Sequence, residues 1–324
     1  MTDQGQSEFT DGKQASLRRI LGQHMSICEN IYKKGYRGVD PCYHYFDIYA
    51  GCGWNEEVDV EGSPIVFVGQ AGTRDLIYRG YFIERDPVAA LRLSQMIEDN
   101  PMVEVYQDDN AERLPLLLDT IDSKRKTFGL IYADPNGMPC FDVLADASRH
   151  PACERIDILI YASATTIKRV RKAYDREDLA SCMSRIAKRK WLIQEPRGHQ
   201  QWTFLLGTNY DGYNSYRGIQ LFGMETARGK EILRRLNYTE AELTAQQQLP
   251  FAYKTYGEYR QLPEFKAVRA QVYKRAGGVC ERCHSAPVTE AHHIKYPPWG
   301  TIDVPENMIA VCHRCHCELH GKED

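Results

Sequence analysis

Cysteine and histidine gather near the carboxyl end of this 324-residue chain. Two pairs, Cys280-x-x-Cys283 and Cys312-x-x-Cys315, each place two thiols in one short turn. This spacing is typical of a four-thiolate zinc site, in which the sulfurs surround one ion at about 2.3 Å. A module of about 60 residues buries too little surface to fold well alone, so a structural metal would also stabilise it. We predict that these four cysteines bind a structural Zn²⁺; four unliganded buried thiols are the alternative.

Histidines accompany the cysteine pairs. His292 and His293 lie between the pairs, Asn307 precedes the second pair, and His316 and His320 follow it. On a helix, residues four apart point to one face, so the side chains of His316 and His320 would lie side by side. Histidine can take a proton from water near neutral pH, and a divalent metal ion stabilises the charge that develops when a phosphodiester is cut. These residue types therefore suit metal-dependent hydrolysis.

This combination resembles the HNH endonuclease family, whose ββα-metal core carries a His-His or Asp-His step, an Asn in the loop and histidines on the closing helix. The resemblance covers about residues 256–322. It implies that His293 is the general base and that Asn307 orients the His293 imidazole. It also implies that His292, His316 and His320 hold one catalytic divalent metal, and an all-histidine site accepts Mg²⁺, Mn²⁺, Ni²⁺ or Zn²⁺. The alternative is a zinc ribbon that only binds nucleic acid.

Acidic side chains and glycines mark the ends of several apolar runs in the first part of the chain. In Asp47-Ile-Tyr-Ala-Gly51-Cys52-Gly53, small residues let a backbone loop approach a ligand. A carboxylate at the end of the next strand can hold two ribose hydroxyls, and ligands of open α/β sheets bind at the carboxyl edge. The candidate cofactor-binding residues are Asp47, Gly51, Gly53, Glu84, Asp108, Asp109 and Asp134.

This series resembles class I S-adenosylmethionine-dependent methyltransferases, and in detail the bacterial three-Cys-motif partner proteins (TcmP), over about residues 9–235. The resemblance includes Lys13, Gly62-Ser63-Pro64 and Trp202-Thr203-Phe204. It implies that the domain binds S-adenosylmethionine or a related nucleoside. Amino-methyltransferases usually follow Asp-Pro with a ring that grips a flipped base, whereas this chain has Asn136-Gly137, so methylation of an exocyclic amine stays open. One alternative is a domain of this fold that has lost its ligand. Another is a dinucleotide-binding domain, but the Gly51-Cys52-Gly53 loop lacks the third glycine of that motif.

Strand-like and helix-like segments alternate around these residues. Strands are predicted at Tyr43–Ala50, Leu76–Glu84, Val103–Gln107, Phe128–Asp134, Ile156–Ala162, Lys190–Gln194 and Trp202–Thr208, and helices at Pro87–Glu98 and Phe265–Arg275. The alternation predicts an α/β domain with a Rossmann-like, methyltransferase-type sheet, plus a small zinc-stabilised ββα-metal (HNH) domain. Residues 54–75 contain many turn formers and are predicted to be an irregular insertion or lid. The predicted domains are 1–240 and 263–324, joined by a linker at 241–262.

The net charge of −3 conceals a basic segment. Residues 1–159 carry 16 Lys/Arg against 26 Asp/Glu, whereas residues 160–235 carry 15 against 7. Two clusters with helix-like spacing dominate the basic segment: Lys168, Arg169, Arg171 and Lys172, and then Arg185, Lys188, Arg189 and Lys190. Such cations release counterions when they contact phosphates, so we predict a nucleic-acid interface. A solvated helix face is the alternative.

Together these features suggest a metal-dependent endonuclease of the HNH type that hydrolyses phosphodiester bonds in nucleic acid, with double-stranded DNA as the expected partner. The methyltransferase-like domain would recognise, position or modify that nucleic acid, as in restriction or antiviral defence, where a partner protein or a homodimer could exert control. One alternative is a nucleic-acid methyltransferase with a zinc-binding docking tail, and another is a non-catalytic sensor or adaptor. The polar amino terminus and the absence of an apolar run of about 18 residues predict a cytoplasmic protein without a membrane partner.

Overall fold

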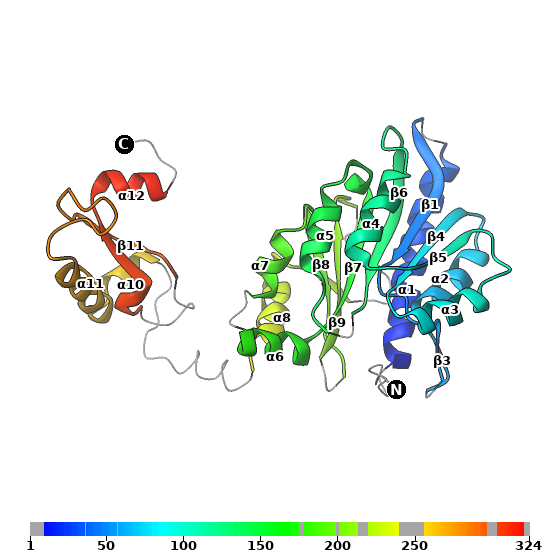
Figure 1. Ribbon diagram of the computed structural model, residues 1–324, viewed down its shortest axis with the longest axis horizontal. Coiled ribbons are helices and arrows are strands. Elements are labelled where there is room, and N and C mark those ends of the chain that lie inside the picture. Colours follow the sequence, from blue (N-terminus) through cyan, green and yellow to red (C-terminus); the bar gives the residue numbers. More distant parts are fainter. Residues whose placement is uncertain are drawn as a thin grey trace. The chain divides into compact units, whose positions relative to one another are not determined.

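The chain folds into two compact units in the computed structural model, Met1–Thr239 and Glu240–Asp324 (Figure 1). The structure describes residues 10–35, 37–56, 58–135, 137–174, 178–198, 201–212, 220–239, 256–296 and 303–320. The division between the units lies beside residue 240, where the first predicted domain ends. No helix in these ranges is long and apolar enough to cross a membrane.

The first unit is built on an eight-stranded, mostly parallel sheet with the order β10-β8-β9-β7-β6-β1-β4-β5. Strand β9 runs antiparallel to β7 and β8, and β10 runs antiparallel to β8. The strands are β1 (Val39–Asp47), β4 (Ile77–Glu84), β5 (Val103–Gln107), β6 (Lys126–Ala133), β7 (Ile156–Ser163), β8 (Lys190–Gln194), β9 (Trp202–Thr208) and β10 (Leu221–Gly223). The predicted α/β class with a large, mostly parallel sheet is therefore confirmed.

Helices cover both faces of this sheet, because its central strands are apolar on both sides. Tyr45 and Phe46 are neighbours in β1 and point to opposite faces, and both are fully buried. The Tyr45 face packs against α1 (Thr10–Lys33), α2 (Ser63–Gly72) and α3 (Pro87–Met96). The Phe46 face packs against α4 (Asn110–Asp119), α5 (Phe141–Ser148), α6 (Ala164–Tyr174), α7 (Leu179–Ser184) and α8 (Ala227–Asn237), with a 3₁₀ turn at Pro151–Glu154.

The predicted irregular insertion at residues 54–75 is wrong. Its first part is a short hairpin, β2 (Trp54–Asn55) and β3 (Val60–Glu61), and its second part is the helix α2. Pro64 occupies the first turn of α2, where a missing N–H costs nothing, and Phe67 stacks on Tyr45 at 4.2 Å between ring centroids. Tertiary packing therefore outweighs the low helix propensity of Gly69.

The second unit contains a hairpin followed by a helix. Strands β11 (Glu290–His293) and β12 (Met308–Val311) pair antiparallel, and α12 (His313–Leu319) follows. The predicted linker at 241–262 needs correction, because α10 (Tyr256–Gln261) belongs to this unit and Tyr259 is buried in its core with Phe265 of α11 (Pro263–Ala276). Residues 240–255 lie outside the described ranges. A 3₁₀ turn, Pro305–Asn307, leads into β12.

Candidate cofactor and metal sites

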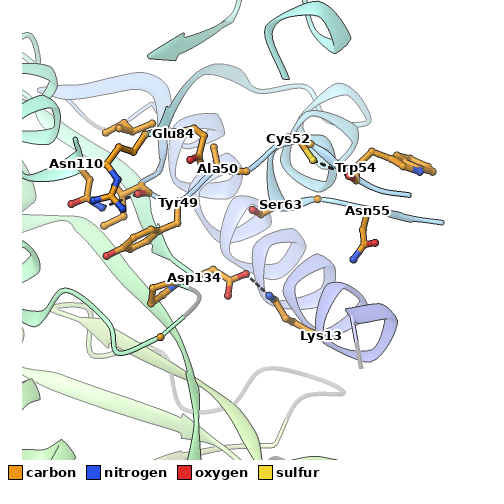
Figure 2. Close-up of a pocket in the computed structure, with 18 of the residues that line it drawn as sticks. Lys13, Tyr49, Ala50, Cys52, Trp54, Asn55, Ser63, Glu84, Asn110 and Asp134 are labelled. Atoms are coloured by element: carbon orange, nitrogen blue, oxygen red, sulfur yellow. Dashed lines mark hydrogen bonds and ion pairs between the residues drawn. The ribbon is translucent and has the colours of Figure 1, made fainter. Parts of the chain in front are cut away.

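A cavity of about 590 Å³ opens at the carboxyl ends of β1, β4, β5 and β6 (Figure 2). This volume lies within the range of small-molecule sites. Six of the predicted cofactor residues line it: Gly51, Gly53, Glu84, Asp108, Asp109 and Asp134. The cavity lies where the sheet order reverses between β1 and β6, which is the position at which open α/β sheets bind ligands.

The loop after β1 forms one wall of this cavity. Gly51 and Gly53 have φ angles of 64° and 82°, which favour glycine, and a Cβ on Gly53 would lie 2.8 Å from Leu93 Cδ1. Glu84 holds the loop, because its carboxylate accepts hydrogen bonds from Gly51 N and Asp86 N, both at 2.8 Å. A carboxylate has about four acceptor positions, so Glu84 can still accept hydroxyl groups of a ligand.

Asp47 differs from the other predicted cofactor residues. Its side chain is fully buried beneath the loop and does not line the cavity, so the predicted direct contact with a cofactor needs correction. It accepts hydrogen bonds from Tyr49 N at 3.3 Å and from the Ser63 side chain. Burial raises the pKa of Asp47 to about 7, although these hydrogen bonds favour the ionised form. Asp47 therefore supports the loop from the interior.

Asp134 faces the cavity at the end of β6 and is paired with Lys13 of α1 (Figure 2). The distance from Lys13 Nζ to Asp134 Oδ2 is 2.5 Å, and the Tyr132 hydroxyl donates to the same oxygen at 3.0 Å. Lys13 Nζ also lies 4.4 Å from the centroid of the Tyr161 ring. The cavity thus offers an ion pair in which one carboxylate oxygen, Oδ1, has no recorded partner among the described residues. Asn136, the first residue at which this chain differs from the amino-methyltransferase motif, lies outside the described ranges.

The acids after β5 are fixed by their own helix. Asp109 caps α4 by accepting from Ala111 N at 2.9 Å, and Asp108 pairs with Arg113 at 2.6 Å, which lowers the pKa of Asp108. Asn110 donates to the Ile48 carbonyl at 3.0 Å and so links α4 to the end of β1. Among the cavity residues absent from the sequence-predicted set, Asn110 could have been recognised from its place directly after Asp108 and Asp109. Lys13 was part of the methyltransferase resemblance but was not assigned to the cofactor site.

The four predicted zinc ligands converge in the second unit. The Sγ atoms of Cys280, Cys283, Cys312 and Cys315 all lie within 4.8 Å of one another. Cys283 Sγ and Cys312 Sγ are 3.9 Å apart, close to the edge of about 3.8 Å in a tetrahedron with metal–sulfur bonds of about 2.3 Å. The donor set and its spacing therefore fit Zn²⁺.

The three predicted histidine ligands converge as well. Ligand nitrogens of His292, His316 and His320 lie within 4.8 Å of one another, and the Nε2 atoms of His316 and His320 are 3.2 Å apart. They line a small cleft of about 180 Å³ with Arg260 and Arg269. Glu290, which was not among the predicted ligands, accepts from His316 Nδ1 at 2.8 Å. A carboxylate on Nδ1 orients the ring so that Nε2 points toward the other two imidazoles, as in many histidine metal sites.

His293 lines the same cleft, but its surroundings differ from the prediction. The prediction that Asn307 orients His293 is corrected, because the carboxylate of Asp303 lies between them. His293 Nε2 contacts Asp303 Oδ2, and Asn307 Nδ2 donates to Asp303 Oδ1 at 3.3 Å. Asp303 is 3% exposed and also accepts from the Tyr259 hydroxyl. Asp303 lies ten residues after His293 but belongs to none of the motifs in the sequence, so no spacing pattern marked it.

The predicted nucleic-acid residues do not form two helical clusters. Lys168 and Arg169 lie on α6, and Arg169 is exposed, while the side chains of Arg171 and Lys172 lie outside the described set. The second cluster follows α7 and leads into β8, which corrects the predicted helix. Arg185 pairs with Asp142 at 2.6 Å, Arg189 pairs with Asp211 at 3.7 Å, and Lys190 begins β8.

Lys188 requires a further correction, because it is buried and does not belong to an exposed basic face. Its Nζ donates to the carbonyls of Cys153 and Ile156 at 2.6 and 2.7 Å. Burial lowers the pKa of Lys188, and the charge of Asp157 acts in the opposite direction. Lys188 therefore stabilises the turn before β7 from inside.

No family model matches the chain, and no curated protein matches it. Solved structures with similar folds include protein LPL1258 from Legionella pneumophila, with 14% identity over 68% of this chain and 93% of that chain and a TM-score of 0.42. They also include TYW2 from M. jannaschii in complex with AdoMet, with 12% identity over 63% and 77% of the two chains and a TM-score of 0.37. A third is a putative rRNA-methylase from Clostridium thermocellum, with 11% identity over 58% and 97% and a TM-score of 0.35. Since these TM-scores lie below 0.5, the assignments below rest on the cavity and ligand geometry of this chain.

Proposed function

We propose that the first unit binds S-adenosylmethionine at the carboxyl edge of its sheet and methylates a nucleic acid. The observation that carries the proposal is the 590 Å³ cavity, in which Glu84 is held beside the Gly51–Gly53 loop by two backbone N–H groups. A carboxylate fixed in this way can accept hydrogen bonds from both hydroxyls of a ribose. Because its side chain is already ordered, binding costs little side-chain entropy. When bound, S-adenosylmethionine would supply an electrophilic methyl group.

Asp134 and Lys13 supply the groups that could orient a methyl acceptor in this cavity. Asp134 Oδ1, which has no partner among the described residues, can accept an N–H from an amine, while Lys13 and Tyr132 hold the other oxygen in place. The hydrogen bond to this carboxylate would orient the lone pair of the amine toward the methyl group, because Lys13 and Tyr132 fix the position of the carboxylate. Helix α6 begins at the carboxyl end of β7, at the same edge of the sheet as the cavity, and its exposed Arg169 could contact the phosphates of a polyanionic substrate.

Transfer of labelled methyl groups to plasmid DNA and to total RNA tests this proposal. We expect incorporation by the wild type, loss of cofactor binding in Glu84→Ala, and loss of transfer with retained cofactor binding in Asp134→Ala. Asp119→Ala changes a carboxylate that is 69% exposed and lies outside the cavity, and serves as the matched control. Absence of calorimetric heat with both S-adenosylmethionine and its demethylated product would contradict the proposal.

A second candidate function, metal-dependent hydrolysis of phosphodiesters, is favoured by the convergence of His292, His316 and His320 beside His293. These three side chains would hold a divalent metal, which when bound would stabilise the charge on the phosphate and leaving oxygen. His293 would accept the proton of the attacking water, and Asp303 would keep its imidazole in one orientation. Arg260 and Arg269 line the cleft and can contact phosphate oxygens.

Nicking of supercoiled plasmid in Mg²⁺, Mn²⁺ or Ni²⁺ tests the second candidate. We expect nicking by the wild type and a loss of at least a hundredfold in His293→Ala and in His316→Ala. Glu318→Gln, which changes an exposed carboxylate on the same helix, is the control. Equal nicking by all variants would identify a contaminant. Methyl transfer that survives His293→Ala would separate the two activities.

A further inference from the structure

A second large cavity lies at the opposite edge of the sheet in the first unit, and neither proposed activity uses it. Its volume is about 1180 Å³. It is bounded by the second half of α1, by the amino ends of β1, β6 and β7, and by the turn between α7 and β8. Ligands of this fold class bind at the carboxyl ends of strands, so the fold alone does not account for a cavity here.

Cations dominate the rim of this cavity. Arg155 and Arg189 have acidic partners, Glu154 at 3.0 Å and Asp211 at 3.7 Å. Lys34, Arg37 and Lys126 are exposed, and no described carboxylate lies within ion-pair distance of any of them. The rim therefore carries three positive charges that are not neutralised by the described part of the protein.

The floor of the cavity combines a buried cation, Lys188, with the buried Asp157–His24 pair and with apolar surface. The charge of Asp157 partly offsets that of Lys188, so the rim cations supply most of the attraction for an anion. Lys188 is 9% exposed, and carbonyls take two of its three N–H donors. Beside it lie the partly or fully buried side chains of Ile27, Ile31, Phe128 and Ile186. A desolvated ammonium with a remaining donor interacts strongly with an anion, and an apolar floor favours a ring over a second charged group.

We propose that this cavity binds a nucleotide, with its phosphate against Lys34, Arg37 and Lys126 and its base on the apolar floor. The three unpaired cations suit the multiple oxygens of a phosphate, and Phe128 offers an aromatic ring to a base. The volume exceeds the upper end of the usual range for small-molecule sites, about 1,000 Å³, so there is room for a nucleotide or for two linked nucleotides. The nucleotide could be free or part of a single strand, and both sources share this chemistry.

Calorimetric titration of the full chain with AMP and with a ten-residue oligothymidylate tests the proposal. We expect micromolar to millimolar binding of at least one probe, and at least tenfold weaker binding in the double variant Arg37→Glu/Lys126→Glu. Ala187→Trp keeps every charge but fills the cavity from its exposed wall, and should weaken binding to a similar extent. Binding of AMP identifies a free nucleotide as sufficient, and binding of the oligomer alone identifies a strand.

Two controls separate this cavity from other positive surfaces and from the carboxyl-edge cavity. Lys230→Glu changes an exposed lysine of α8 outside the cavity and should leave the affinity unchanged. Glu84→Ala should also leave it unchanged, because Glu84 lines only the other cavity. The proposal is overturned if neither probe binds, or if affinity is the same in the wild type, the double variant and Ala187→Trp. Its failure would leave the methyltransferase proposal untouched.

Discussion

The carboxyl-edge cavity and the histidine–cysteine sites bring polar groups together in opposite ways. The cavity draws Lys13, Glu84 and Asp134 from three separate elements. The parallel sheet places Glu84 and Asp134 at one edge, and Lys13 reaches Asp134 from α1. The cysteine and histidine sites draw their ligands from residues 280–320, where the chain is close in space because it is close in sequence. The hydrophobic core holds the first site, whereas we expect metal ions to complete the second.

This difference predicts where each site is vulnerable. Around the cavity, polar side chains are already satisfied by backbone groups, as Glu84 is by Gly51 N and Asp86 N. In the second unit, four thiols and three imidazoles face one another, and that arrangement is unfavourable without metal ions. The sheet domain should therefore tolerate the loss of its ligand, and the second unit should not tolerate the loss of zinc.

The largest effect is expected from Cys280→Ser, because Cys280 is fully buried. Structural zinc contributes about 10–16 kcal/mol of apparent binding energy in small modules, so the second unit should unfold while the first keeps its melting transition. Differential scanning calorimetry with zinc analysis measures both. Cys317→Ser, on α12 but outside the thiolate cluster, should change neither. A single shifted transition for the whole chain would break the distinction between the units.

The next effect concerns the buried carboxyl of Asp47. Its pKa is raised to about 7 in the folded protein and lies near 4 when unfolded, so between these values the folded state binds more protons. Stability from this group is fully present below pH 4 and is lost as the pH rises to 7. Asp47→Asn removes the titrating group. The free energy of unfolding of this variant, relative to that of the wild type, should therefore rise by up to about 4 kcal/mol between pH 4 and 8.

Urea unfolding at several pH values measures this gain. Asp119→Asn, at a site that is 69% exposed, should give a difference that does not depend on pH. If Asp47→Asn and the wild type lose stability in parallel, then Asp47 is ionised at pH 5 and the loop is held by charge. The carboxyl-edge site would then depend on charge, as we expect for the cysteine and histidine sites of the second unit.

The sequence predicted the sheet well where its strands are continuous apolar runs. The bounds of β5, β8 and β9 match the prediction. Strands β8 and β9 are buried on both faces and end at polar residues, whereas β5 lies at the edge of the sheet and was marked by its β-branched residues and its polar end. The helix α2 was missed, because Gly69 and Gly72 suggest turns and only the contact of Phe67 with Tyr45 reveals the helix. Local composition cannot report a contact with a strand that lies elsewhere in the chain.

The sites follow the same rule. The convergence of the four cysteines and of the three histidines was predictable, because their spacing is typical of metal ligands. Asp303 and Glu290 were not, because their roles depend on where a hairpin places them beside His293 and His316. Asp47 was assigned to the cofactor on its position before the glycine loop, and only the fold shows that it points inward.

Glu290→Gln tests whether the histidine site also depends on its surroundings. Loss of the carboxylate on His316 Nδ1 should weaken binding of Mn²⁺ or Ni²⁺ by about 10–100-fold, as for other carboxylates behind metal-bound histidines. Calorimetric metal titration gives the affinity, and Glu318→Gln on the neighbouring helix is the control. Unchanged affinity would mean that the three imidazoles alone fix the metal.

The smallest effect on stability is expected at Gly51, where a substitution changes only the strain of the backbone. Its φ is 64° and a Cβ there would meet nothing within 4 Å, so Gly51→Ala should lower the free energy of unfolding by about 1–2 kcal/mol through strain. Gly69→Ala in α2 also meets no neighbour but has helical backbone, so it should raise stability by about 0.5–1 kcal/mol. Chemical denaturation measures the free energy of unfolding of both variants, which should fall for Gly51→Ala and rise for Gly69→Ala. If both substitutions stabilise the protein, then the loop rearranges freely, and the carboxyl-edge site is not preorganised by the sheet.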